Sequence, residues 1–477
     1  MASLTAPTVR VRDIEFGVRP VRLRLPFRFG ALSLRACPQV FVRAAVEVEG
    51  RAPVWGHAAE LAVPRWFDKR PDRNLQANVQ DLIDALQLAA DAYCSVGALP
   101  AAALSLRLLP ELANEGRRRG WTALSAAYGG AMLDRAVLDA LCRALGLSVF
   151  HAVRHDLVGL SHSDVPDDLA GWGWHAWLAD LRPLQRLQVR HTVGLLDDLG
   201  SRSDATDGHP DSLRSAIRQQ GLRVFKVKLG GDPVADLDRL AAVIDVLHGA
   251  APDFRFTVDG NEQYAGPGAL AALFDGLQRL PEIDRLLYIE QPLPRERSQA
   301  GPLPAGAPAP LLLDEADDAL DAFVHARQAG WTGVSSKLCK GLYKALLNRA
   351  RCDRWNADGT GPRCFMSAED LTCQAGIAVQ QDLAWAALLG LAHCERNGHH
   401  YADGFGDAPA DEQAAFAAAH PDLYETAAGR PRLHIAAGRI EIGSLFGTGF
   451  AHGADPDFRF MQPLQDASAL VAADGSP

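Results

Sequence analysis

The sequence predicts an α/β protein, a (β/α)8-type TIM barrel with an α+β capping domain. Two changes in the hydrophobic pattern along the chain, and the position of charged residues at the ends of apolar runs, predict this fold class. Strand-like alternation near the amino terminus gives way to helical stretches, after which short apolar runs alternate with further helical stretches. Charged residues end several successive runs of this second part, as they do at the carboxyl ends of barrel strands.

The cap is predicted over residues 1–150. Residues 8–50 alternate like the strands of a small antiparallel sheet, and the stretches 73–94 and 130–147 have helical periodicity. Strands followed by helices indicate an α+β domain. Residues 151–186, which are rich in Trp, Asp and Leu without a clear period, are predicted to be an insertion or linker.

The barrel is predicted over residues 187–430. Its short apolar runs are LQVRHTVGLL, RVFKVKL, FRFTVDG, RLLYIEQ, PLLLDE, GVSSKL and RCFMSAED, with an eighth strand expected near His393. Successive βα units imply parallel strands, and no Gly-x-Gly-x-x-Gly follows the first run, which argues against a dinucleotide-binding sheet. Residues 431–477 form a C-terminal segment, in which the alternation of 431–443 predicts a strand that returns to the cap.

The composition is that of an ordinary globular protein. The chain has 477 residues, 48% of them hydrophobic and 22% charged, and a net charge of −10 that argues against a nucleic-acid or anionic-membrane partner. No apolar run approaches the roughly 18 residues that span a bilayer, and the amino terminus lacks the layout of a signal peptide. The eight cysteines show neither a CxxC pair nor a disulfide spacing. We therefore expect a cytoplasmic protein with free thiols.

The lysines are few and clustered. Of the 48 basic residues only six are lysines, and five of these lie at 226–228 and 337–344. In a strand over 224–228, Lys226 and Lys228 point to the same side, and both sides of the strand are otherwise apolar. Lysine loses its proton when its surroundings lower its pKa, whereas arginine does not. The clusters therefore indicate either titratable amines that matter for function or buried structural ion pairs.

The strand ends bring acidic residues together with these lysines. The predicted second to sixth strands end in Lys226 and Lys228, in Asp259 and Asn261, in Glu290, in Asp314 and Glu315, and in Lys337. Carboxylates that converge at one barrel mouth repel one another unless a cation lies between them, and an all-oxygen ligand set favours Mg²⁺, Mn²⁺ or Ca²⁺ over zinc. The alternative is a ring of structural salt bridges.

The chain carries, in this order, the cap, the K-x-K pair and the motifs VDGN, IEQP, LLLDE and SSKLCKG. In the order of these motifs it resembles the enolase superfamily. Within it the chain is similar to the mandelate racemase/muconate lactonising enzyme family, and most similar to the two-lysine, muconate lactonising-like branch. The resemblance covers most of the chain and implies the modified, (β/α)7β form of the barrel. It also implies one Mg²⁺ ion, with Mn²⁺ as a substitute, held by Asp259, Glu290 and Asp314. Glu315 is the alternative third ligand, on the opposite face of its strand.

The resemblance implies a reaction as well. Lys228 and Lys337 would be the acid/base pair, and Lys226 would lower the pKa of Lys228 by like-charge proximity. The expected activity is abstraction of the α-proton of a small carboxylate to give a metal-stabilised enolate, most simply by a racemase or epimerase. The alternatives are a lyase (an acid-sugar dehydratase), a cycloisomerase or o-succinylbenzoate synthase-like enzyme on the same site, and a non-catalytic superfamily member. A homo-oligomer is expected.

Substrate contacts are expected from two cap loops, 25–36 and 60–71, and from the barrel. The candidate substrate-binding residues are Asn261, Arg28, Trp66, Phe67, Lys340, Glu369 and Asp370. His393, His399 and His400 are interpreted as pocket-wall or surface residues. The chain departs from the family pattern in having one glycine after the strand-six lysine, long segments at 160–186 and 350–363, and no histidine at strand seven.

Overall fold

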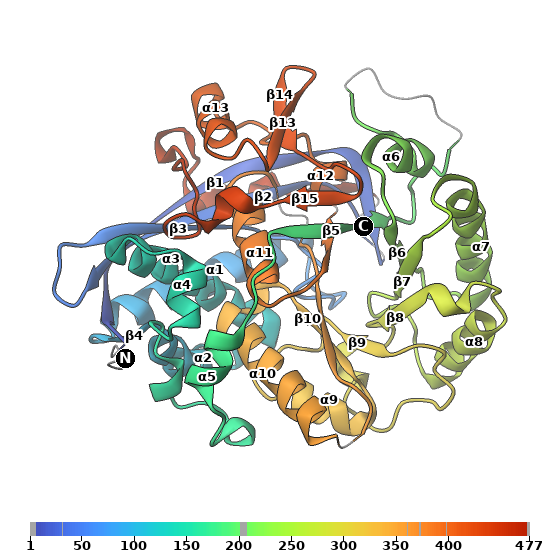
Figure 1. Cartoon of the computed structure of the whole chain (residues 1–477), viewed down its shortest axis with the longest axis horizontal. Helices are drawn as coiled ribbons and strands as arrows, with labels where there is room; N and C mark the ends of the chain where they lie inside the picture. Colours follow the sequence, from blue (N-terminus) through green and yellow to red (C-terminus); the bar gives the residue numbers. More distant parts are fainter. Residues whose placement is uncertain are drawn as a thin grey trace.

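The structure consists of a cap and a closed barrel (Figure 1). It is a computed structural model, and it describes residues 6–30, 32–200, 208–359, 361–371, 374–396 and 398–474. None of the helices in these residues combines the length and the apolarity that spanning a bilayer requires. The cysteines within the described ranges are all free, as the sequence predicts.

The cap sheet is built on one long hairpin. Its strands are β1 (Thr8–Phe29), β2 (Leu32–Val48), β3 (Val54–Leu61), β4 (Leu99–Pro100) and β16 (Ala472–Asp474). The strands pair antiparallel, with β2 contacting β1, β3 and β16, and with β4 on the other edge of β1. The alternating pattern of residues 8–50 therefore does form the predicted antiparallel sheet.

Helices cover one side of this sheet. They are α1 (Leu75–Ser95), α2 (Ala101–Arg118), α3 (Ala123–Leu145) and α4 (Val149–Arg154). The side chain of Asn74 accepts a hydrogen bond from the N–H of Ala77 and begins α1, and Gly146 ends α3 in the left-handed conformation, at φ 68°. The periodicity does not predict α2, which contains Pro110 in its interior.

The residues between cap and barrel form short helical turns. These are η1 (Leu160–His162), η2 (Asp167–Leu169) and α5 (Trp174–Asp180). They are fastened to the barrel by an ion pair between Asp168 and Arg351, at 2.7 Å, and by a hydrogen bond from the indole of Trp177 to Asp353, at 2.9 Å.

Eight parallel strands in the described part of the chain close into the barrel. They are β5 (Arg186–Val193), β6 (Val224–Lys228), β7 (Arg255–Asp259), β8 (Leu286–Glu290), β9 (Leu311–Leu313), β10 (Gly333–Ser336), β11 (Phe365–Ala368) and β12 (His393–Arg396). Each strand pairs with the next in chain order, and β12 pairs with β5 to complete the ring. This confirms the predicted fold class.

The barrel helices alternate with these strands (Figure 1). They are α6 (Leu213–Gln220), α7 (Pro233–Ala250), α8 (Pro267–Gln278), α9 (Ala322–Ala329), α10 (Leu342–Asp358) and α11 (Ile377–Leu388), and the 3-10 turns are η3 (Ile283–Arg285), η4 (Arg295–Arg297) and η5 (Leu338–Lys340). A 3-10 turn, η4, is the only helical element between β8 and β9 in the described chain. The prediction of a long loop over 350–363 was wrong for residues 350–358, because these residues belong to α10, which continues to Asp358.

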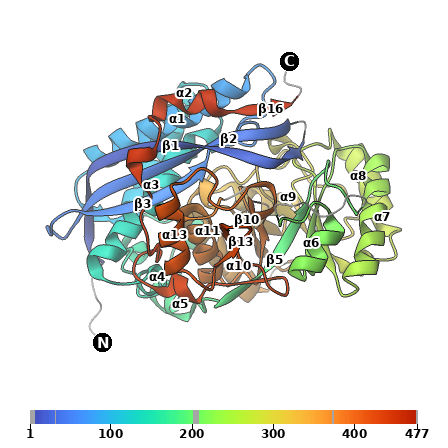
Figure 2. The same cartoon turned by 90° about the horizontal axis from the view of Figure 1, so that it is seen from above.

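The C-terminal segment crosses from the barrel to the cap later than predicted. Its elements are α12 (Gly398–Tyr401), α13 (Ala410–Ala419), β13 (Tyr424–Ala427), β14 (Arg430–Leu433), β15 (Arg439–Glu441), η6 (Gly443–Phe446), η7 (Phe458–Phe460) and η8 (Leu464–Leu470). The prediction that 431–443 returns to the cap was wrong, because β14 pairs with β13 and β15 pairs with the barrel strand β5. The chain pairs with the cap sheet first at Gln462, which forms an antiparallel bridge with Val18 of β1, and then at β16, beside β2 (Figure 2).

Candidate active site

Three predicted carboxylates end three neighbouring strands of the barrel. Asp259 and Glu290 are the last residues of β7 and β8 and are paired in register, and Asp314 directly follows β9. All three side chains are fully buried. The carboxyl ends of the strands therefore bring these acidic groups to one end of the barrel.

The loops after β7 and β8 are tightly fitted to each other. A Cβ on Gly260 would lie 2.6 Å from Cα of Pro292, so the VDGN and IEQP motifs need a glycine at this point. The backbone is left-handed at Asn261 (φ 41°), Glu262 (φ 67°) and Gln291 (φ 30°). Such conformations cost about 1–3 kcal/mol each and cluster at functional sites. The N–H of Glu262 donates to the carbonyl of Gln291 at 2.8 Å, which holds the two loops together.

Lys226 lies at the centre of an acidic cage. Its Nζ is 2.8–3.0 Å from carboxylate oxygens of Asp259, Glu290, Glu369 and Glu395. Burial alone would lower the pKa of Lys226, but these carboxylates outweigh it and raise the pKa well above its ordinary value. The carboxylates of this cage therefore favour the charged form of Lys226.

Lys228 and Lys337 lie on opposite sides of the ring. Lys228 is on β6 and Lys337 directly follows β10, and these strands are four places apart in a ring of eight, with the carboxylate-bearing strands between them. The Nζ of Lys228 is 2.6 Å from Asp259, and the Nζ of Lys337 is 2.9 Å from Asp314. The acidic groups are thus flanked by one amine on each side.

The carboxylates fit an oxygen-liganded divalent cation. Glu290 Oε2 is buried and makes no hydrogen bond within the described residues. Burial, together with the charges of Asp259 and Glu369, raises the pKa of Glu290 well above its ordinary value, which marks an excess of negative charge. A hard cation with oxygen ligands, such as Mg²⁺, would relieve that excess and would compete with the lysines for the same oxygens.

Glu315 faces away from this group, as its strand parity predicts. Its Oε1 accepts hydrogen bonds from Nζ of Lys69, at 3.0 Å, and from the amide of Asn261, at 3.1 Å. Lys69 comes from the cap loop 60–71 and also contacts Glu262 at 2.7 Å. Glu315 and Asn261 therefore lie where this cap loop meets the barrel.

The same cap loop places Trp66 over the site. The Nζ of Lys337 lies 4.3 Å from the ring centroid of Trp66, within the range of a cation–π contact. Phe67 packs instead against Trp66 and Tyr128 of the cap helix α3. Arg28 is exposed near the turn between β1 and β2. Of the three predicted cap residues, Trp66 is thus the one that contacts a predicted catalytic lysine.

The remaining predicted substrate residues are buried in polar networks. The Nζ of Lys340 binds Ser335 at 2.6 Å and Asp317 at 3.1 Å, and Asp370 accepts from the N–H of Gly398 at 3.2 Å. Glu369 binds Lys226 at 2.8 Å, accepts from the hydroxyl of Tyr288 at 3.1 Å and pairs with Arg190.

The prediction missed Arg190 and Glu395, which complete the polar interior. Glu395 on β12 binds Lys226 at 2.9 Å and accepts from the hydroxyl of Thr192 at 2.7 Å. Arg190 on β5 pairs with Glu369 and contacts Nδ1 of His393 at 2.6 Å. Arg190 is a charged residue inside the predicted strand run VRHTV, and a buried charge there is a signal that could have found it. The run HCER is too polar to single out Glu395.

The two predicted histidines whose side chains are described have partners other than the three predicted metal ligands: Nε2 of His400, for example, lies 3.8 Å from Oδ2 of Asp197. His393 contacts Arg190, and His400 is buried with its ring centroid 5.1 Å from that of His191. The side chain of His399 lies outside what the structure describes.

Comparisons with known proteins agree with this geometry. Residues 210–418 match a family described as enolase C-terminal domain-like, and no curated protein sequence matches the chain. An enolase from Bradyrhizobium, complexed with magnesium and mandelic acid, is 18% identical with a TM-score of 0.58 over 93% of this chain and 96% of that one.

Two further solved structures have named activities. A muconate lactonizing enzyme from Pseudomonas fluorescens, complexed with muconolactone, is 17% identical with a TM-score of 0.59 over 94% of this chain and 97% of that one. A dipeptide epimerase from Enterococcus faecalis V583, complexed with Mg and a dipeptide, is 14% identical with a TM-score of 0.57 over 93% and 99%. The family match agrees with the resemblance noted from the motifs: residues 210–418, which carry the strands β6 to β12, match the enolase C-terminal domain-like family, and these solved structures share the fold of the chain.

Proposed function

We propose that the chain is an enzyme that removes the α-proton of a small carboxylate substrate, and that it is a racemase or epimerase. One observation carries the proposal: Lys228 and Lys337 flank the buried carboxylates from opposite sides of the ring. A substrate carbon between them would have one amine on each face. Removal of a proton on one face and its return on the other inverts the configuration of that carbon.

The metal ion would be held by Asp259, Glu290 and Asp314. Bound there, Mg²⁺ supplies Lewis-acid stabilisation of the negative charge that develops on the substrate. The magnesium in the crystals of two structural neighbours, from Bradyrhizobium and Enterococcus faecalis, supports this choice of cation. The carboxylic ligands in the same crystals, mandelic acid and a dipeptide, support the substrate class.

The lysines do the proton chemistry at Nζ. A lysine that acts as a base must be neutral at the moment of proton transfer. Burial lowers the pKa of Lys337, but the nearby charge of Asp314 outweighs burial and raises this pKa above its ordinary value. Competition of a divalent cation for the Asp314 carboxylate would favour the neutral amine. Lys226 and Lys228 contact the same oxygen of Asp259, at 3.0 and 2.6 Å, so their charges repel each other at close range. A positioned base or acid of this kind typically contributes about 10²–10⁴-fold to the rate.

The test is exchange of the substrate α-proton with D₂O across a panel of chiral carboxylates, in the presence of Mg²⁺. The wild-type chain should exchange and invert at least one member. Lys228→Ala and Lys337→Ala should each abolish inversion, and each should still exchange the proton of one enantiomer through the remaining lysine. Exchange without inversion in the wild type would replace the racemase proposal with a lyase or a cycloisomerase.

Two further variants separate the base from a mere positive charge. Lys228→Arg should fail as completely as Lys228→Ala, because a guanidinium does not serve as a base at neutral pH. Lys344→Met is the matched control, because Lys344 is a buried lysine on α10 that contacts Asp317, and it should retain activity. Near-normal turnover by Lys228→Arg would show that Lys228 provides only a positive charge and does not act as a base.

A further inference from the structure

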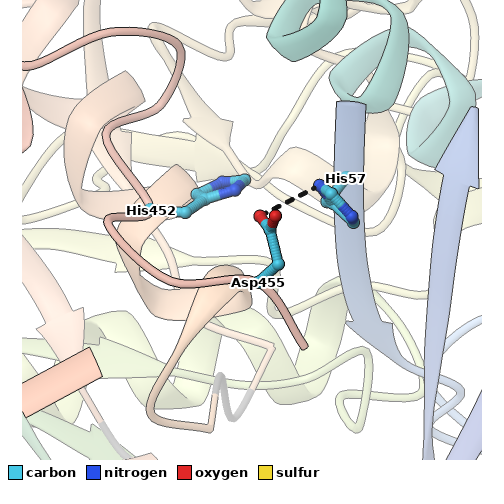
Figure 3. A group of neighbouring side chains, drawn as sticks. All are labelled: His57, His452 and Asp455. Atoms are coloured by element: carbon cyan, nitrogen blue, oxygen red, sulfur yellow. Dashed lines mark ion pairs between the residues drawn. The ribbon is translucent and has the colours of Figure 1, made fainter. Parts of the chain in front are cut away.

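A second group of metal-ligand side chains lies outside the barrel mouth, where the C-terminal segment crosses the cap. His57 comes from the cap strand β3, and His452 and Asp455 come from the segment between η6 and η7 (Figure 3). One ligand atom from each of the three residues lies within 4.8 Å of the others. The carboxylate of Asp455 lies between the two imidazoles in Figure 3.

His57 has an unused nitrogen that faces this group. Its side chain is 5% exposed, yet Nδ1 makes no hydrogen bond within the described residues. This nitrogen lies 3.5 Å from Oδ1 of Asp455 and 4.0 Å from Oδ2 of Asp139. An unsatisfied buried polar atom costs about 1–3 kcal/mol, so its orientation toward two carboxylates calls for a ligand.

We propose that His57, His452 and Asp455 bind a divalent transition-metal ion of the zinc type. Two imidazole nitrogens and one carboxylate oxygen are characteristic zinc ligands, in contrast to the all-oxygen set in the barrel. Tetrahedral coordination with bonds of about 2.0–2.2 Å places ligand atoms roughly 3.3–3.5 Å apart. The His57–Asp455 separation of 3.5 Å already matches this spacing.

Burial favours the neutral form of both imidazoles, which is the form that binds metals. Burial lowers the pKa of His57 to about 4, although Asp455 opposes this effect, and burial also lowers the pKa of His452. Neutral imidazoles have a free lone pair at pH 7. Asp139, whose Oδ2 is 3.7 Å from Nδ1 of His452, provides a further carboxylate beside the group.

The group is accessible from solvent. Asp455 has a side-chain exposure of 57%, and a cavity of about 450 Å³ is lined by Arg143, His452 and Asp455 among other residues. An ion and a water ligand can therefore enter from this cavity without rearrangement of the buried core.

Arg143 holds the position that the ion would take. Its guanidinium lies 3.0 Å from Oδ1 of Asp455, 3.1 Å from Nδ1 of His452 and 2.8 Å from Oδ2 of Asp139. The side chain is 23% exposed, so it can release Asp455 and His452 and keep its pair with Asp139. The positive charge of Arg143 shows that the group favours a cation, and it also predicts that removal of this side chain strengthens metal binding.

A second cluster, of Asp156, His162 and His175, serves as the comparison. Its ligand atoms are equally close, but both histidines are exposed. The oxygens of Asp156 already accept from the N–H groups of Leu160 and Ser161, at 2.7 and 3.0 Å. No unpartnered buried atom of the described chain points into it, so it carries no proposal.

The test measures zinc binding to the full chain by isothermal titration calorimetry, with Mg²⁺ present in excess to occupy the barrel carboxylates. Wild-type protein should bind one more zinc ion than the Asp455→Asn variant. Asp455→Asn, a substitution at an exposed side chain, and His57→Gln should each weaken this binding at least about tenfold. Arg143→Gln should strengthen it, and His162→Gln should leave it unchanged.

Thermal unfolding gives an independent readout. Zinc should raise the melting temperature of the wild type and of His162→Gln, because the ion would join the C-terminal segment to β3, and a chelator should reverse the shift. Asp455→Asn should show no such shift. Equal zinc stoichiometry and affinity in wild type and Asp455→Asn would overturn the proposal. So would binding that is lost in His162→Gln but kept in Asp455→Asn.

Discussion

The pKa values of two adjacent carboxyls, Asp314 and Glu315, shift in opposite directions because the side chains face opposite sides of one strand end. Burial raises the pKa of both carboxyls. At Asp314 this effect is outweighed by Lys337 and Lys340, which hold the pKa well below its ordinary value. At Glu315 the single nearby amine of Lys69 does not compensate for burial, and the pKa remains raised. Asp314 is the better placed ligand for a divalent cation, because it lies with Asp259 and Glu290 at neighbouring strand ends, whereas Oε1 of Glu315 is held by Lys69 and Asn261.

This difference predicts the effect of removing each carboxylate. Asp314→Asn should abolish activity and the Mg²⁺-dependent rise in thermal stability together, whereas Glu315→Gln should keep that rise. A ligand at 100 times its Kd contributes about 2.7 kcal/mol, which a thermal shift assay detects. If Glu315→Gln lost the Mg²⁺-dependent shift and Asp314→Asn kept it, Glu315 and not Asp314 would be the third metal ligand.

At the scale of elements, one buried carboxyl joins three cap helices. Asp134 on α3 accepts hydrogen bonds from the hydroxyls of Tyr93 on α1, at 2.6 Å, and Ser105 on α2, at 2.7 Å. Burial raises the pKa of Asp134 to about 7, against these hydrogen bonds and the nearby Arg135. The folded chain therefore keeps a proton on Asp134 at pH values where the unfolded chain has lost it.

The raised pKa of Asp134 determines how the free energy of unfolding depends on pH. With a folded pKa above the unfolded value of about 3.9, the group lowers the free energy of unfolding as pH rises from about 4 to about 7. The slope is at most about 1.4 kcal/mol per pH unit. Urea unfolding at pH 5, 6 and 7 should show a shallower decline for Asp134→Asn than for the wild type, because asparagine does not titrate. Asp91→Asn, at an exposed position on α1, is the control, and equal slopes in wild type and Asp134→Asn would contradict the prediction.

Elements were predictable from sequence where the pattern was local. The alternation of residues 8–50 and the repeating βα units predict the cap sheet and the barrel, because each pattern follows from the burial of one face or of both faces. The helix α2 was missed, since Pro110 lies inside it. Strand alternation in 431–443 predicts strands but not their partners, and the partners here are β13 and the barrel strand β5.

At the scale of the whole molecule, the site depends on contacts that no local pattern predicts. Asp259, Glu290, Asp314 and the lysines could be found because barrel strands place their ends together. Arg190 and Glu395 were missed because their role depends on the pairing of β12 with β5, the last step of ring closure. The contact of Trp66 with Lys337 likewise depends on how the cap docks on the barrel.

That docking is held by Arg295, in the 3-10 turn that follows β8. Its guanidinium donates to the carbonyls of Trp66 and Phe67, both at 3.0 Å, and pairs with Glu262 at 2.8 Å. The cap loop 60–71 is thereby fixed to the loops after β7 and β8. Because this loop carries Trp66, Arg295 controls the position of the aromatic ring over Lys337 without touching the carboxylates itself.

Arg295→Met should therefore loosen the cap loop and leave the metal site intact. Charge-assisted hydrogen bonds contribute about 1.5–3 kcal/mol, so their loss should lower kcat/KM about tenfold or more, mainly through a higher KM. The Mg²⁺-dependent thermal shift should be unchanged, because Arg295 contacts none of the proposed ligands. Arg297→Met is the matched control, since Arg297 is exposed on the same turn and should behave like the wild type. A wild-type kcat/KM in Arg295→Met would mean that Lys69, through Glu262 and Glu315, is sufficient to hold the loop.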